Sequence, residues 1–168
     1  MPNAQSPPPS PAQSAEPSPA QSVHHILQNY RTVAVVGLSP KPARDSWQVA
    51  HYMQKQGWRI VPVNPIAAAE NAQILGETVY ASLGQAAQAL AARGEKIELV
   101  DCFRNSADIP PVAAEAIAIG AHALWMQLGV AHAEAAALAR TAGLWVVENR
   151  CLEIDHMASL RAAKLPEH

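Results

Sequence analysis

The sequence predicts an α/β fold in which helices cover both faces of a doubly wound parallel sheet of about five strands. Three observations support this prediction. Five short β-rich runs alternate along the chain with stretches of helical composition. The runs are almost continuously apolar, which is typical of strands that are buried on both faces. Glycines follow the helical stretches, as expected at helix C-termini, at positions 57, 94, 120 and 143.

The order of these elements also predicts where a ligand binds. Strands are expected at 32–37, 59–64, 97–103, 121–129 and 144–149, and helices at 46–56, 82–92, 109–119 and 132–142. Right-handed crossovers in a Rossmann-like sheet then favour the strand order 3-2-1-4-5. We therefore expect a crevice at the carboxyl ends of the strands, between the loops that follow the first and fourth strands.

The N-terminal segment differs from the rest of the chain. Residues 1–22 contain seven prolines and almost no large apolar side chain, so burial cannot offset the entropy of ordering them. We expect 1–22 to be a disordered Pro/Ser/Ala-rich tail that keeps the protein soluble or meets a polyproline-reading partner. Residues 23–168 are expected to form one domain.

Charge and composition exclude several classes of partner. The formal net charge is −2 and the twelve Lys and Arg residues form no basic run, which disfavours nucleic acid. The chain has no apolar stretch of about 20 residues and no secretory signal, so we expect no membrane partner and a cytoplasmic location. Its two cysteines match no metal spacing and are expected to be free thiols.

The loop after the first strand, "GLSPKPARDS", favours an anion. Gly37 permits a tight turn, and the free amides of the following helix attract negative charge. Lys41 and Arg44 lie in the same loop as the hydroxyls of Ser39 and Ser46. Phosphate is therefore the predicted ligand group, although a strand-to-helix turn with solvated charges would have the same composition.

The next two strand ends distinguish between nucleotides. A site for NAD usually has an acid after the second strand, and one for NADP often has Arg. Asn64 and Pro65 stand there instead, and G-x-G-x-x-G is also missing. Phe103 and Arg104 end the third strand, where an aromatic ring and a guanidinium could hold a purine and a phosphate; Phe103 could equally be a core residue.

The last two strand ends complete the predicted crevice. Gln127 and Gly129 lie at the carboxyl end of the fourth strand and could contact a base or an amide, whereas Trp125 and Leu128 are expected to pack. Cys151 follows the fifth strand, where it could meet a ligand thiol or be a small buried residue. No metal motif or catalytic motif is visible, so we expect no metal and no catalytic residue.

Five segments in order, "VAVVGLSPKPARDSW", "VPVNP", "VDCFRNSADIPP", "WMQLGV" and "ENRCLEIDH", resemble the CoA-binding domain family. That family is similar to the N-terminal domain of the succinyl-CoA synthetase alpha subunit. The resemblance covers about residues 24–158 and implies coenzyme A as the cofactor, bound by the twelve residues named above as site candidates. Asn149, where the family commonly has Asp, and Cys102, where it has an aliphatic residue, depart from the pattern.

The resemblance implies a stand-alone CoA or acyl-CoA binding protein with a carrier, sensor or regulatory role. The synthetases use a histidine of a further domain, so no catalytic step of its own is expected here. One alternative is an NAD(P)- or nucleotide-binding enzyme or regulator. Another is a subunit that supplies the CoA site to a multi-chain acyl-CoA synthetase. The protein partner and the acyl group are left open by the sequence.

Overall fold

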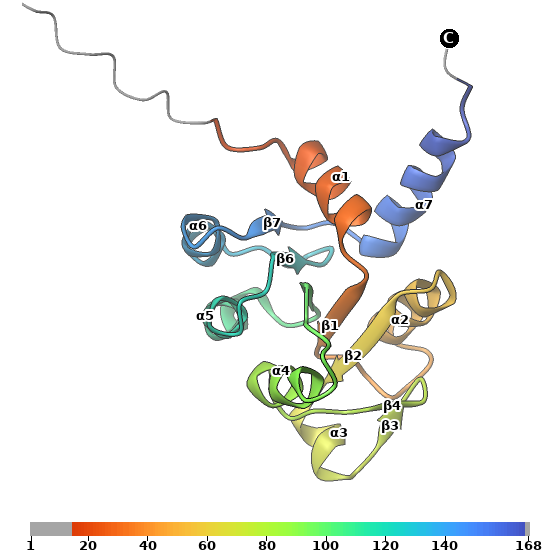
Figure 1. Ribbon diagram of the computed structural model, residues 1–168, viewed down its shortest axis with the longest axis vertical. Coiled ribbons are helices and arrows are strands. Elements are labelled where there is room, and N and C mark those ends of the chain that lie inside the picture. Colours follow the sequence, from red (N-terminus) through yellow and green to blue (C-terminus); the bar gives the residue numbers. More distant parts are fainter. Residues whose placement is uncertain (1–14, 167–168) are drawn as a thin grey trace, which may run out of the picture.

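A five-stranded parallel sheet forms the centre of the computed structural model, which describes residues 15–166 (Figure 1). Its strands are β1 (Thr32–Val36), β2 (Arg59–Val63), β5 (Leu99–Cys102), β6 (Ala123–Met126) and β7 (Trp145–Val147). Almost every residue of these strands is buried, as the continuous apolar runs predict. The predicted α/β class with a doubly wound parallel sheet is confirmed.

Helices pack on both faces of this sheet. One face contacts α1 (Pro19–Asn29), α2 (Asp45–Lys55) and α7 (Leu152–Ala163). The other face contacts α4 (Leu83–Ala91), α5 (Ile109–Ala118) and α6 (Ala133–Thr141). Between β2 and α4 the chain forms the short helix α3 (Pro65–Ala69) and a hairpin of β3 (Gln73–Ile74) and β4 (Glu77–Thr78). A 3-10 turn at Ser106–Asp108 precedes α5.

The order of the strands corrects one detail of the prediction. The sheet runs β2-β1-β5-β6-β7, which is 2-1-3-4-5 in chain order, where 3-2-1-4-5 was expected. The crossover through α2 and the crossover through α4 pass over opposite faces. Right-handed crossovers over opposite faces step in opposite directions, so β5 pairs with β1 and β2 lies at the edge. The topological switch point is therefore between β1 and β5.

The start of the domain also differs from the prediction. Residues 1–14 of the expected tail lie outside the described residues, but positions 19–22 form the first turn of α1. Ser18 caps this helix: its hydroxyl accepts from the Gln21 N–H, and the Gln21 side chain accepts from the Ser18 N–H. Pro19 occupies the first helical position, where its missing N–H costs nothing. Proline therefore starts a helix here, which composition alone could not distinguish from a proline-rich tail.

Helices that could span a membrane and clusters of metal ligands are both absent from the described part of the chain. No helix there has the length and apolar character needed to span a membrane. Within residues 15–166, no three His, Cys, Asp or Glu side chains cluster as metal ligands.

Candidate functional site

The loop between β1 and α2 is held in shape by its own hydroxyl groups. The Ser39 N–H donates to Ser46 Oγ at 3.0 Å, and the Lys41 N–H donates to Ser39 Oγ at 3.1 Å. Ser46 is buried and Ser39 is half-buried. Since both oxygens accept these bonds, each hydroxyl still has a proton to donate to a ligand.

The N-terminus of α2 adds positive potential to this loop. Arg44 is the N-cap residue, and in the described part of the chain no side chain caps the first turn. The first-turn N–H groups are therefore free to bind an anion. Lys41 and Arg44 are exposed beside them, together with one carboxylate, Asp45. A shallow depression there is lined by all five residues predicted for this loop: Gly37, Ser39, Lys41, Arg44 and Ser46.

The ends of β1 and β5 touch at Gly37. Gly37 has φ +85°, and a Cβ placed on it would lie 2.3 Å from the carbonyl oxygen of Phe103. The Phe103 N–H donates to the Val36 carbonyl at 2.9 Å, which locks the two strand ends together. The crevice therefore lies between the first and third strands in chain order. The segments after the first and fourth strands were expected to face each other, and residues from both, such as Asp45 and Leu128, do line one cavity.

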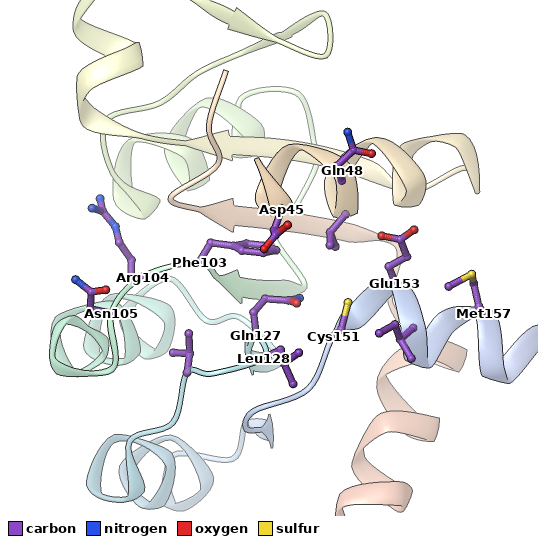
Figure 2. Close-up of a pocket in the computed structure, with 13 residues that line it drawn as sticks. Asp45, Gln48, Phe103, Arg104, Asn105, Gln127, Leu128, Cys151, Glu153 and Met157 are labelled. Carbon is purple, nitrogen blue, oxygen red and sulfur yellow. The ribbon is translucent and has the colours of Figure 1, made fainter. Parts of the chain in front are cut away.

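A cavity of about 570 Å³ opens beside the β1–α2 loop (Figure 2). Its walls come from the start of α2, the ends of β5 and β6, and the start of α7. Asp45 and Phe103 line both the cavity and the loop depression, so the two are continuous. The other lining residues are Gln48, Val49, Arg104, Asn105, Gln127, Leu128, Val130, Cys151, Glu153, Ile154 and Met157.

Gln127 is held in the cavity wall by a buried acid. Its side-chain amide donates to Asp101 Oδ1 at 2.8 Å, and only 3% of Gln127 is exposed. Asp101 is fully buried, and its Oδ2 has no hydrogen-bond partner among the described residues. Burial raises the pKa of Asp101 to about 7, against the smaller lowering effect of the Gln127 bond. This acid was not predicted as a site residue, because nothing in the apolar run around it marks its environment.

The turn between β7 and α7 positions Cys151. Asn149 has φ +54°, and its Oδ1 accepts from the Gly129 N–H at 2.7 Å. Arg150 forms a two-bond ion pair with Asp155 at 2.7 and 2.8 Å. Cys151 is therefore fixed, half-buried, at the cavity wall, and burial is the main cause that raises the pKa of its thiol. The departure from Asp to Asn at position 149 still leaves an oxygen that accepts the Gly129 bond.

Three predicted site residues do not line the cavity or the loop depression. Asn64 uses its side chain locally: Oδ1 accepts from the Ile66 and Ala67 N–H groups, and Nδ2 donates to the Leu38 carbonyl. Pro65 begins the short helix that Asn64 caps. Gly129 has its N–H bound by Asn149. Asn64 therefore ties α3 to the β1–α2 loop, which is a supporting role.

The cavity wall that α7 contributes was not predicted. Glu153, Ile154 and Met157 of this helix line the cavity together with Leu128, which was expected to pack but is 69% exposed. Trp125, by contrast, is fully buried, as expected. The sequence carries no apolar stripe that marks this helix, because two of its three inward-facing residues, Asp155 and His156, are polar.

Comparisons with known proteins agree with this architecture. Protein YneT of Bacillus subtilis (strain 168), described as uncharacterized, is 34% identical over 135 residues, which cover 80% of this chain and 91% of YneT. A hypothetical protein from Pyrococcus horikoshii OT3 has a solved structure with a TM-score of 0.71 and 35% identity, covering 82% of this chain and 89% of that one. A Thermus thermophilus protein has a TM-score of 0.70 and 29% identity, covering 82% and 96% respectively.

A match to a protein-family model identifies the family. The model described as "CoA binding domain" matches residues 31–157, which is most of the chain and includes the loop, the cavity walls and the start of α7. The predicted family is thus confirmed: the chain belongs to the CoA-binding domain family.

Proposed function

We propose that the protein binds coenzyme A, with the phosphates at the β1–α2 loop and the pantetheine arm in the adjoining cavity. The observation that carries this proposal is the uncapped N-terminus of α2 beside Lys41 and Arg44. Free helix amides and two cations favour a phosphate group. The depression continues into a mixed polar and apolar cavity, which suits a chain of amides and methylenes attached to that phosphate.

Phe103 and Arg104 lie at the junction of the two parts. Phe103 lines both the depression and the cavity, and Arg104 extends from the next position of the chain (Figure 2). A bound nucleotide can stack on the Phe103 ring while Arg104 contacts a phosphate. This arrangement supports the role that the family resemblance implies for both residues.

We further propose that the protein is a stand-alone binding module with a carrier, sensor or regulatory role, located in the cytoplasm. The thiol of Cys151 is the side chain in the cavity wall that could act as a nucleophile. Burial raises the pKa of this thiol, which keeps it in the less reactive protonated form. Both cysteines are free, which suits a reducing compartment. These observations favour holding a CoA thioester over transferring its acyl group.

We expect CoA to raise the melting temperature of the protein, and NAD to leave it unchanged. Saturation at 100 times the dissociation constant stabilises the folded state by about 2.7 kcal/mol, or roughly 5–10 °C for a domain of this size. Thermal unfolding with CoA, dephospho-CoA, NAD and ATP in parallel measures this. A shift with NAD and none with CoA would contradict the proposal.

We expect Arg44→Ala to weaken CoA binding by about tenfold, because it removes a charged donor to phosphate. Pantetheine, which has no phosphate, should lose much less affinity, and titration calorimetry with both ligands measures the difference. The matched control is Lys55→Ala, which removes an exposed cation from the opposite end of the same helix. Equal losses for both ligands, or an equal loss in the control, would count against a phosphate site at this loop.

A further inference from the structure

Two large apolar side chains that line the cavity are exposed. Leu128 follows β6 and is 69% exposed, and Ile154 lies in the first turn of α7 and is 57% exposed. Met157 lies one helical turn beyond Ile154 and lines the same cavity. Exposed apolar side chains that gather at one cavity mark a place where a ligand can remove them from water.

The apolar end of the cavity, at Met157 of α7, lies away from the phosphate side. Figure 2 shows Arg104 and Asn105 at one side, Phe103 and Asp45 in the middle, and Met157 at the opposite side. On the proposed function, on which this inference rests, the phosphates lie at the loop that shares Asp45 and Phe103 with the cavity. The far end of the ligand, its thiol and any group attached to that thiol, then reaches the apolar end.

The charges around the cavity indicate what that group is. Among the described lining residues the one cation is Arg104, and Figure 2 shows it at the side of the cavity opposite Met157. Glu153 is drawn beside the apolar end, near Cys151. A free carboxylate at the end of a dicarboxylic acyl group would lie near Glu153 without a cation to neutralise it, which costs binding free energy.

We propose that the apolar wall of the cavity, which runs from Leu128 beside Gln127 to Ile154 and Met157 of α7, binds the uncharged aliphatic acyl group of an acyl-CoA thioester. An aliphatic chain covers the exposed surfaces of these side chains, whereas free CoA leaves them in water. A dicarboxylic acyl group is disfavoured by Glu153. The ligand class is therefore neutral acyl-CoA.

Titration calorimetry with CoA, butyryl-CoA, hexanoyl-CoA and succinyl-CoA tests this class. We expect hexanoyl-CoA to bind about tenfold more tightly than CoA, because it buries additional apolar area. Butyryl and succinyl groups have the same four-carbon chain and differ in one terminal carboxylate. We expect succinyl-CoA to bind about tenfold more weakly than butyryl-CoA.

Two variants assign these differences to the residues. Ile154→Ser should reduce the ratio of the CoA to the hexanoyl-CoA dissociation constant from about ten to below three. Glu153→Gln should narrow the gap between butyryl-CoA and succinyl-CoA. Leu138→Ser is the matched control, since Leu138 is 56% exposed on α6, which packs on the other face of the sheet, and both ratios should stay as in the unchanged protein.

The outcomes separate this inference from the proposed function. If CoA and all its thioesters fail to bind, the proposed function is wrong and the acyl site falls with it. If CoA binds but hexanoyl-CoA binds no more tightly, or succinyl-CoA matches butyryl-CoA, the acyl site is wrong and CoA binding stands. Ratios that change equally in Ile154→Ser and Leu138→Ser would also overturn it.

Discussion

Gly37→Ala should lower the free energy of unfolding by about 3 kcal/mol and abolish measurable CoA binding. Any other residue at φ +85° carries strain of about 1–2 kcal/mol. The added Cβ would also meet the Phe103 carbonyl oxygen at 2.3 Å, so the ends of β1 and β5 must separate. That separation displaces both the β1–α2 loop and Phe103, which are the two parts of the site proposed to hold the nucleotide. Urea unfolding and CoA calorimetry measure the two effects.

Gly57→Ala is the matched control for this prediction. Gly57 has φ +90°, but a Cβ placed on it meets no atom within 4 Å. Gly57→Ala therefore introduces the backbone strain without the close contact. It should lower the free energy of unfolding by about 1 kcal/mol and leave CoA binding intact. If the two variants have equal free energies of unfolding, the close approach of the strand ends does not contribute to the loss of stability in Gly37→Ala. If Gly37→Ala binds CoA normally, the proposed place of the phosphates is wrong.

The sequence predicted the fold class because its signals are local. The apolar runs at β1, β2 and β5 and the glycines that follow the helices depend on near neighbours in the chain, and the structure has them close to the predicted positions. The strand order depends on which face each crossover helix covers. Both α2 and α4 are amphipathic, and neither sequence states which face of the sheet it will pack on. The order 2-1-3-4-5 therefore came only from the structure.

In the candidate site, too, local features were predicted and features that depend on packing were not. The structure brings the five residues predicted for the β1–α2 loop together at one depression, and all five lie within ten positions of each other in the chain. Asn64 was predicted to face the ligand, but its side chain is occupied by local backbone bonds that its position before Pro65 allows. Cavity walls built from separate elements, such as Leu128 with Ile154, were not predicted. Their proximity depends on how α7 packs beside the end of β6.

The carboxyl group of Asp101 should make the protein less stable as the pH rises. Its pKa is raised from 3.8 to about 7 in the folded protein, mainly by burial, and no cation contributes to the shift. Near it are the thiols of Cys102 and Cys151, whose pKa values its charge helps to raise. The folded state therefore holds this proton more tightly than the unfolded state between about pH 4 and pH 7. Over that window the contribution of Asp101 to the free energy of unfolding falls as the pH increases.

Asp101→Asn should remove this pH dependence. A shift of about three pKa units corresponds to about 4 kcal/mol, so the stability of the variant relative to the unchanged protein should rise by about that amount from pH 4 to pH 8. The amide has nearly the same shape, and its Oδ1 can still accept from Gln127, which keeps the cavity wall in place. Urea unfolding at pH 4, 5, 6, 7 and 8 gives the difference, and Asp108→Asn, at an exposed carboxylate, is the control that should show no such rise. A constant difference across the pH range would mean that Asp101 has the same proton affinity folded and unfolded, and that its burial does not govern the stability of this sheet.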